Sequence, residues 1–441
     1  MILKIGLMSI MSMVCLIGCA QEQIVVSGKR EPISAVVATA KTEDNFAILK
    51  SGSMAFIPSQ TTENSSWPQS HGTPNTRVPH PSLGGALTLQ WSTSIGKGDQ
   101  SRNRITAEPI IYNNQIFTVD SLMVLSATSK KGEILWQKDL TPNGENKGDV
   151  SGAGLAAGGG TIFVATAYGL IHAIDPASGQ TKWTQILLGS GSTRPTYYDG
   201  LVYLVSNDES AWAIDARTGR VNWTLDNFSD VNNLISNTAP SLSEKFAVFG
   251  YGSGVVQAVF RQSGLTVWTT SISGGRSGRA LSIVEDIVSS PVIDDSTVYV
   301  ANGSGRITGL NLNSGERLWG KPFGTVGNIW PAGDSLFLVN DLSQLVRMRK
   351  DNGDVIWSVQ LPSFVKVNPK KSKEVVAHFG PIIASGKIVL ISSDEKLRVY
   401  DPRDGSIISE SEIPGGATSN PVIANNVLYF VSRKGDLHAF R

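Results

Sequence analysis

Residues 173–183 read Ala-Ile-Asp-Pro-Ala-Ser-Gly-Gln-Thr-Lys-Trp, and residues 213–223 read Ala-Ile-Asp-Ala-Arg-Thr-Gly-Arg-Val-Asn-Trp. Both stretches contain a short apolar run that ends in Asp and a glycine that precedes a tryptophan by four residues. Glycine accepts the positive φ of a tight turn without steric strain, and the tryptophan can pack across to a neighbouring unit. The pattern therefore predicts a turn that leads into an outer β-strand.

The glycine–tryptophan pair recurs along the chain at intervals of 38 to 52 residues. Its six complete copies are Gly132/Trp136, Gly179/Trp183, Gly219/Trp223, Gly264/Trp268, Gly315/Trp319 and Gly353/Trp357. A seventh copy, Gly405 to Ser409, has lost its tryptophan, and Trp91 forms an eighth whose first half is missing. Repetition at this period is the sequence signature of solenoids, propellers and arrays.

Each repeat opens with an apolar run, usually after a proline, and continues as turn, strand, turn and strand. In the last repeat, strands are predicted at 421–423, 427–431 and 437–440, separated by Asn425-Asn426 and Lys434-Gly435 turns. The prolines that open six other repeats are Pro109, Pro195, Pro240, Pro291, Pro331 and Pro381, and Gly154 stands in that place in the second repeat.

Eight antiparallel four-stranded units of this size can close into a β-propeller, an all-β fold whose strand edges stay short and protected. The segment Leu87–Ser94 around Trp91 offers one outer strand, and the last repeat before Arg441 offers only three strands. We therefore predict an eight-bladed propeller in which the N-terminal strand completes the C-terminal blade. An open solenoid would need polar caps at both ends, whereas this chain finishes in Leu437-His438-Ala439-Phe440.

The composition is typical of a turn-rich β protein. Charged residues make up 17% of the chain, and the 441 residues include 45 Gly and 10 Trp. Lys and Arg number 38 against 37 Asp and Glu, so no basic excess exists to hold a nucleic acid through counterion release. A nucleic-acid partner is therefore not expected.

The N-terminus has the pattern of an exported lipoprotein. Residues 1–18 combine Lys4 with an apolar run from Ile5 to Ile17, as in a signal peptide. Leu16-Ile17-Gly18-Cys19 resembles the bacterial lipobox, in which the cysteine is lipidated. Ala20 rather than Asp follows, which by the sorting rules of such lipoproteins implies the outer membrane, with the protein facing the periplasm. A plain secretory peptide with an incidental thiol is the alternative.

Three segments are therefore expected. They are a signal peptide at 1–18, the lipidated Cys19 with a flexible polar tether at 19–80, and the propeller at 81–441. The tether is expected from its Ser, Thr, Asn, Gln and Pro content and weak periodicity. Because Cys15 and Cys19 are the two cysteines of the chain, the propeller is expected to hold by burial, without disulfides or thiolate metal sites.

No catalytic motif is found, so no catalytic residues, metal or cofactor are predicted. The histidines are scattered at His71, His80, His172, His378 and His438. His172 and His438 occupy the same slot in two repeats, which favours half-buried strand residues over metal ligands. Asp175, Asp215 and Asp401 also repeat by position, and we expect their side chains to cap turns.

The stretches from Ala173 and Ala213 resemble the pyrroloquinoline-quinone repeat, and the resemblance spans about residues 85–441. Proteins with this repeat divide into quinone-dependent dehydrogenases and non-catalytic scaffolds. The dehydrogenases hold quinone and Ca²⁺ over the central channel, typically with a vicinal disulfide and long inserted loops. This chain has no cysteine pair in its repeats, and its units average about 45 residues, which favours a scaffold. A quinone-dependent dehydrogenase remains the alternative.

The lipobox, the tether and one eight-bladed propeller of this repeat together resemble the BamB family of lipoproteins of the outer-membrane β-barrel assembly machinery. The resemblance implies a scaffold that is anchored in the inner leaflet of the outer membrane and binds the periplasmic domains of the barrel-forming subunit. The binding loops of the family lead into the first strands of adjacent blades. Here those loops precede Pro240 and Pro291.

The family motifs in these two loops are only partly kept. The first loop of the family carries Leu-x-Leu-Arg, of which this chain keeps Leu234 and lacks the arginine. The second carries Asp-x-Asp, of which Asp286 remains in register. The resemblance therefore implies partner contacts at Leu234 and Asp286, with Ile235, Glu285 and Val288 as altered neighbours. An ordinary loop role is the alternative for both residues.

Two further features leave other uses open. The connections from Trp268 to Pro291 and from Trp357 to Pro381 are the longest on their rim, and the second contains four lysines between Lys366 and Lys373. Those lysines could dock an acidic or lipid-proximal surface, although a solvated charge run explains them as well. A saccharide-binding propeller is a third function, and its support is Trp67 and Trp330, which we expect to be exposed.

Overall fold

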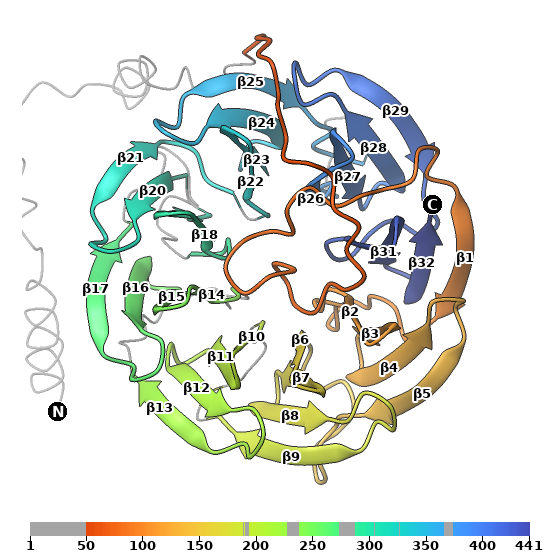
Figure 1. Ribbon diagram of the computed structural model, residues 1–441. Coiled ribbons are helices and arrows are strands. Elements are labelled where there is room, and N and C mark those ends of the chain that lie inside the picture. The colour runs from red at the N-terminus through yellow and green to blue at the C-terminus, as the bar shows by residue number, and fades with distance from the viewer. Residues whose placement is uncertain are drawn as a thin grey trace, which may run out of the picture. The chain divides into compact units, whose positions relative to one another are not determined.

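Eight four-stranded antiparallel sheets stand as blades around a common axis and close into a ring (Figure 1). The computed structural model describes residues 50–187, 189, 194–226, 238–272, 287–303, 305–325, 327–365 and 374–441. In these ranges every strand belongs to one of the eight sheets, and no helix occurs. The predicted all-β, eight-bladed propeller is confirmed.

The blades are numbered along the chain. Blade 1 contains β2 (Ile110–Tyr112), β3 (Gln115–Val119), β4 (Val124–Ser129) and β5 (Ile134–Asp139), and blade 2 contains β6 (Ala153–Gly158), β7 (Thr161–Thr166), β8 (Leu170–Ile174) and β9 (Thr181–Ile186). Blade 3 contains β10 (Thr196–Tyr198), β11 (Leu201–Val205), β12 (Ala211–Asp215) and β13 (Val221–Leu225), and blade 4 contains β14 (Ser241–Leu242), β15 (Phe246–Gly250), β16 (Val255–Phe260) and β17 (Thr266–Ser271). Blade 5 contains β18 (Val292–Asp294), β19 (Thr297–Ala301), β20 (Ile307–Asn311) and β21 (Arg317–Lys321), and blade 6 contains β22 (Trp330–Ala332), β23 (Ser335–Val339), β24 (Gln344–Arg349) and β25 (Val355–Gln360). Blade 7 contains β26 (His378–Ala384), β27 (Lys387–Ser392), β28 (Lys396–Tyr400) and β29 (Ile407–Glu412), and blade 8 contains β30 (Val422–Ala424), β31 (Val427–Val431), β32 (Asp436–Phe440) and β1 (Leu89–Ser94).

Burial falls from the inner to the outer strand of a blade. In blade 2, every residue of β7 is buried, because neighbouring blades cover both faces of this strand. The outer strand β9 instead alternates between exposed and half-buried positions. The hydrophobic core is therefore divided among the seams between blades, where one sheet packs against the next.

The ring is closed by strands from the two ends of the described chain. β1 pairs antiparallel with β32, with Trp91 opposite Ala439 and Thr93 opposite Leu437. The order in this sheet is β1-β32-β31-β30, so the N-terminal strand is the outer strand of blade 8. The predicted closure is confirmed.

The repeated glycine and tryptophan join each blade to the next. Gly219 has φ of +73°, and a Cβ placed on it would lie 2.7 Å from Cδ2 of Trp183 in the preceding blade. Seven indole Nε1 groups donate hydrogen bonds to turn carbonyls of the following blade: Trp91 to Lys130, Trp136 to Pro176, Trp183 to Ala216, Trp223 to Arg261, Trp268 to Leu312, Trp319 to Lys350 and Trp357 to Pro402. The motif thus encodes both a turn and an inter-blade contact.

The expected boundary between tether and propeller at residue 80 needs a correction. Residues 62–80, which we expected in the flexible tether, pack into the centre of the ring, where Trp67 and Arg77 are buried. These residues are held by their contacts with the blades and not by a periodic strand pattern of their own. Cys19 and residues 20–49 lie outside the described residues, so the lipidation site and the first part of the tether stay predictions.

Candidate functional site

Two faces of the ring are distinguished by their connections. The antiparallel order of the blades places the turns between first and second strands, such as Asn113–Asn114, on one face, called here the turn face. The connections from the outer strand of one blade to the first strand of the next lie on the opposite face, called here the loop face. Both loops that resemble the partner-binding loops belong to the loop face.

The predicted partner residues lie outside the described residues. This holds for Leu234, Ile235, Glu285 and Asp286, and for the lysine segment 366–373. The structure describes the chain on both sides of these segments, up to 226 and 272 and again from Thr238 and Ile287, so that Val288, the altered neighbour in the second loop, is described and is half-buried. Their contact with a partner therefore stays a prediction.

The ends of these two loops are joined to each other. The backbone N–H of Ala239 donates to Ser290 Oγ at 2.9 Å, and Ser241 Oγ donates to the Pro291 carbonyl at 2.6 Å. Thr238 Oγ1 also donates to the Gly250 carbonyl at 3.1 Å. The two loops therefore return to the ring next to each other, at the channel end of blades 4 and 5.

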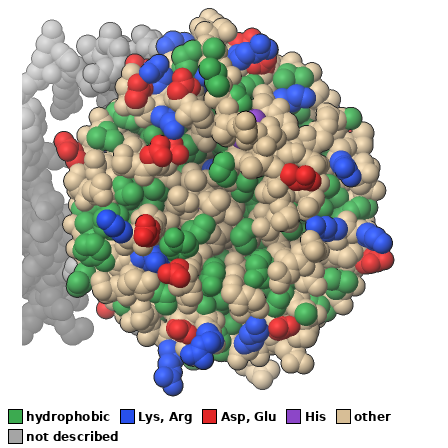
Figure 2. Space-filling view, in the orientation of Figure 1, with side chains coloured by type: hydrophobic (Ala, Val, Ile, Leu, Met, Phe, Trp, Pro, Cys, Tyr) green, Lys and Arg blue, Asp and Glu red, His purple; other side chains and the backbone are tan. Residues whose placement is uncertain are grey.

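The central channel is filled by residues 62–83, called here the plug, which contact all eight blades. Backbone hydrogen bonds join plug residues to six blades: Trp67 to Ile111, Pro68 to Ala157, Pro74 to Leu242, Asn75 to Ile293, Pro81 to Ser385 and Asn64 to Asn425. The other two blades are reached by side chains, Gln69 Oε1 accepting from Tyr197 N and Arg77 Nε donating to the Ile329 carbonyl. In Figure 1 this segment crosses the centre of the ring, and Figure 2 shows that same centre covered by side chains and backbone.

Trp67 and Trp330 are buried, which corrects our expectation that they are exposed. They are 2% and 1% exposed, and their ring centroids lie 6.2 Å apart. Each ring packs in the interface between the plug and the ring of blades, so neither is free to stack on a sugar. The observation that favoured a saccharide-binding propeller is therefore lost.

Polar side chains gather at the loop-face end of the channel. Ser70, His71 and Arg77 come from the plug, and Glu108, Arg194 and Asn420 precede the first strands of blades 1, 3 and 8. These six residues are called here the channel cluster. Ser70 Oγ donates to Glu108 Oε2 at 2.7 Å, Arg194 Nη1 lies 3.1 Å from Glu108 Oε1, and Asn420 Nδ2 donates to the same Oε1.

Burial and charge set the protonation states of the channel cluster. Burial, together with the positive charges of Arg77 and Arg194, holds the pKa of His71 well below its usual value. Burial also lowers the pKa of Arg77 to about 10, against the opposing effect of Glu108. At neutral pH His71 is therefore neutral, and Arg77 remains charged.

The remaining histidines and aspartates have structural partners. His172 Nδ1 lies 3.0 Å from Thr184 Oγ1, and the buried His438 lies 2.7 Å from Ser92 Oγ through Nδ1. Asp175 Oδ1, Asp215 Oδ1 and Asp401 Oδ1 each accept backbone N–H groups of the turn that follows, which confirms the predicted capping role. Among the residues described, no three His, Cys, Asp or Glu side chains stand close enough to hold a metal ion.

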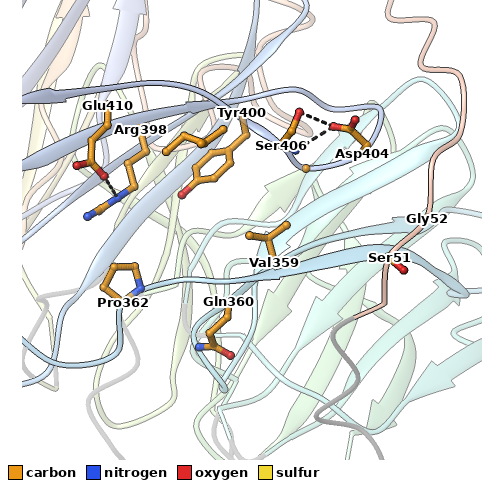
Figure 3. Close-up of a pocket in the computed structure, with 12 residues that line it drawn as sticks. Ser51, Gly52, Val359, Gln360, Pro362, Arg398, Tyr400, Asp404, Ser406 and Glu410 are labelled. Carbon is orange, nitrogen blue, oxygen red and sulfur yellow. Dashed lines mark hydrogen bonds and ion pairs between the residues drawn. The ribbon is translucent and has the colours of Figure 1, made fainter. Parts of the chain in front are cut away.

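A groove of about 770 Å³ opens on the outer side of blades 6 and 7 (Figure 3). Residues 51–52 and the end of β25 form one side of it, and β28 and β29 form the other. Within it Arg398 is held by two carboxylates, since Nε donates to Glu410 Oε2 at 2.9 Å and Nη2 lies 2.6 Å from Asp394. Asp404, another charged residue that lines the groove, accepts hydrogen bonds from the backbone N–H and the hydroxyl of Ser406.

Sequence reasoning missed the channel cluster. Arg77, Glu108 and Arg194 are far apart in the sequence and belong to no motif. The one available signal is that Glu108 and Arg194 directly precede prolines that open a repeat, Pro109 and Pro195. That position places a side chain at the channel, because the first strand of each blade lines it.

Comparison with protein families and relatives gives a consistent result. A family model described as outer membrane protein assembly factor BamB matches residues 120–359. The BamB of Yersinia pestis is 25% identical over 361 residues, which cover 80% of this chain and 88% of that protein. The BamB of Escherichia coli K12 is 22% identical, with coverage of 80% and 88%.

Two solved structures share the fold. BamB from Moraxella catarrhalis superposes with a TM-score of 0.65 at 18% identity, covering 81% of this chain and 100% of that one. The quinohemoprotein alcohol dehydrogenase ADHIIG from Pseudomonas putida HK5 superposes with a TM-score of 0.59 at 14% identity, covering 86% and 80%. At these identities, the likeness supports the propeller architecture and does not separate scaffold from enzyme.

Proposed function

The chain belongs to the family of the outer membrane protein assembly factor BamB, and on this basis we propose that it is a non-catalytic scaffold of the outer-membrane β-barrel assembly machinery. The observation that carries the proposal is the match of the family model to residues 120–359. Relatives from the same family also align with this chain along most of their own length. The scaffold would bind the periplasmic domains of the barrel-forming subunit and aid the insertion of outer-membrane proteins.

The filled channel favours this function over a quinone-dependent dehydrogenase. In that class, quinone and Ca²⁺ are expected over the central channel. Here the plug occupies the channel and is hydrogen-bonded to all eight blades. A cofactor in that position would have to displace residues that the ring itself holds.

The partner surface is proposed on the loop face at blades 4 and 5. Leu234 and Asp286 would supply an apolar anchor and a carboxylate, with Ile235 and Glu285 beside them. The direct hydrogen bond between Ala239 and Ser290 supports the placement, because it holds the ends of both loops together. One partner domain could then contact both loops at once.

The interface is tested with two substitutions and a matched control. Leu234→Asp and Asp286→Lys should each weaken binding of the purified periplasmic domains by about 1–3 kcal/mol without lowering the melting temperature. Glu145→Lys, an exposed charge reversal in another loop of the same face, should bind like the wild type. Equal losses of affinity and thermal stability would assign the residue a structural role. Unchanged affinity in both variants would place the interface elsewhere.

Membership of the machinery and the lipid anchor are tested in cells. Affinity purification from solubilised envelopes should recover the barrel-forming subunit, and failure to do so, with normal outer-membrane protein levels after deletion, would refute the scaffold function. Cys19→Ser should abolish labelling with palmitate and release the protein into the periplasm. Dye reduction that depends on added quinone would instead favour the dehydrogenase alternative.

A further inference from the structure

The channel cluster contains one more positive charge than it can balance. Arg77 and Arg194 carry two guanidinium groups, and among the described residues Glu108 is the carboxylate that contacts or faces them. Arg77 is 3% exposed and Glu108 is 4% exposed. A buried charge without a counter-charge is strongly unfavourable, so the cluster needs another negative group.

Most of the acceptor capacity of Glu108 is already used. Glu108 Oε2 accepts from Ser70, and its Oε1 accepts from Asn420 and faces Arg194 Nη1. Arg77 uses Nε on the Ile329 carbonyl and Nη1 on the Ser70 carbonyl, at 3.1 and 3.5 Å. Three donors thus share the two oxygens of Glu108, and neither Arg77 Nη2 nor Arg194 Nε reaches them.

Several buried donors of the channel cluster and of its neighbours in the chain have no hydrogen-bond partner among the described residues. These atoms are Arg77 Nη2 and Arg194 Nε of the cluster, Gln69 Nε2 and Ser419 Oγ, which adjoin cluster residues in the chain, and Ser289 Oγ, two residues before Pro291. His71 Nδ1 is not one of them, because Nε2 donates to the Pro291 carbonyl and leaves Nδ1 of the neutral ring as an acceptor. Buried polar groups are nearly always satisfied, so this set points to a ligand rich in acceptors.

We propose that the channel cluster binds one small oxyanion, of the phosphate type, between Arg77 of the plug and Arg194 of blade 3. Guanidinium groups pair with oxyanions through charge-assisted hydrogen bonds, and the ligand would balance the excess charge of the cluster. Arg194 is 19% exposed, so the site reaches solvent through this side chain. Because the same ligand would contact both the plug and blade 3, its binding would stabilise the folded ring with the plug in place relative to the unfolded chain. This inference does not depend on any role in membrane-protein assembly.

The test measures phosphate binding by isothermal titration calorimetry on the mature, detergent-solubilised protein in chloride buffer at constant ionic strength. We expect saturable binding of one phosphate per chain and a higher melting temperature. Arg194→Gln should weaken binding at least about tenfold. Glu108→Gln should strengthen binding severalfold, because it removes the competing carboxylate. Arg102→Gln, an exposed arginine on the loop face with the same change of charge, should bind like the wild type.

The outcomes decide the proposal in either direction. Absence of saturable phosphate binding to the wild type, or equal affinity in a folded Arg194→Gln variant, would overturn it, as would an equal loss in Arg102→Gln. Circular dichroism spectra confirm that each variant is folded. Titrations with sulfate and acetate separate a tetrahedral oxyanion from a carboxylate ligand: binding of acetate alone would overturn the assignment to the phosphate class.

Discussion

Replacing Trp67 by alanine tests whether the plug is part of the folded ring. The side chain is 2% exposed and packs on Trp330, while its backbone forms two hydrogen bonds with Ile111 at 2.9 and 2.8 Å. The substitution removes the indole and keeps both backbone bonds. The indole Nε1 has no hydrogen-bond partner, so the loss is one of packing alone. Large-to-small substitutions of buried tryptophan typically cost about 3–5 kcal/mol, and we expect a loss in this range.

The assay is equilibrium unfolding in urea, followed by circular dichroism, with the free energy of unfolding compared between variants. Ile57→Ala serves as the control, because this exposed side chain lies shortly before the plug in the chain and should change stability by less than about 0.5 kcal/mol. A flexible tether at this position would make Trp67→Ala as harmless as the control. A loss below about 1 kcal/mol would therefore refute the assignment of the plug to the fold.

The remaining predictions concern the seams, the closure and the pH dependence. Trp183→Ala should cost about 2–3 kcal/mol in urea unfolding, less than Trp67→Ala, because the indole is only half-buried although it loses its hydrogen bond to Ala216. Deletion of residues 420–441 should abolish the single cooperative melting transition, since it removes three strands of blade 8 and the partner of β1; a truncated monomer that melts like the parent would contradict ring closure. The pKa of buried His71 is depressed, so the unfolded chain takes up its proton first, near pH 6.5, and this contribution to stability is lost as the pH falls below that value. His71→Gln should therefore flatten the decline of stability between about pH 6.5 and 5, and an unchanged slope would show that His71 is not buried in neutral form.

The ring was predictable from the sequence because nearly every blade contains its own local sequence motif. A glycine at positive φ and a tryptophan four residues later define one turn and one contact with the next blade, and the pair is repeated along the chain. The missing strand of the last repeat and the isolated strand around Trp91 indicated closure for the same reason. Local signals of this kind need no knowledge of distant residues.

The plug and the channel cluster could not be predicted in the same way. Trp67 lies among serines and a proline, so its surroundings in the sequence predicted exposure, whereas its burial depends on Trp330, far along the chain. Arg77, Glu108 and Arg194 meet because the ring brings the starts of its inner strands together. Order that comes from one or two contacts with each of eight blades leaves no periodic trace in the sequence.

The path of the N-terminal segment explains how an anchored propeller could keep its loop face free. Lys50 is bonded to Ser358 on the outer strand of blade 6, and the chain then passes Arg403 of blade 7 before it enters the channel. The covalent link towards Cys19 therefore leaves the ring at the outer edge of blade 6, whereas the proposed partner loops arise at blades 4 and 5. If Cys19 carries the lipid as proposed, the 31 residue steps from Cys19 to Lys50 (50 minus 19) can span at most about 110 Å when extended. The attachment at blade 6 and the proposed partner loops at blades 4 and 5 belong to different blades, so a partner seated on those loops would not have to displace the attachment.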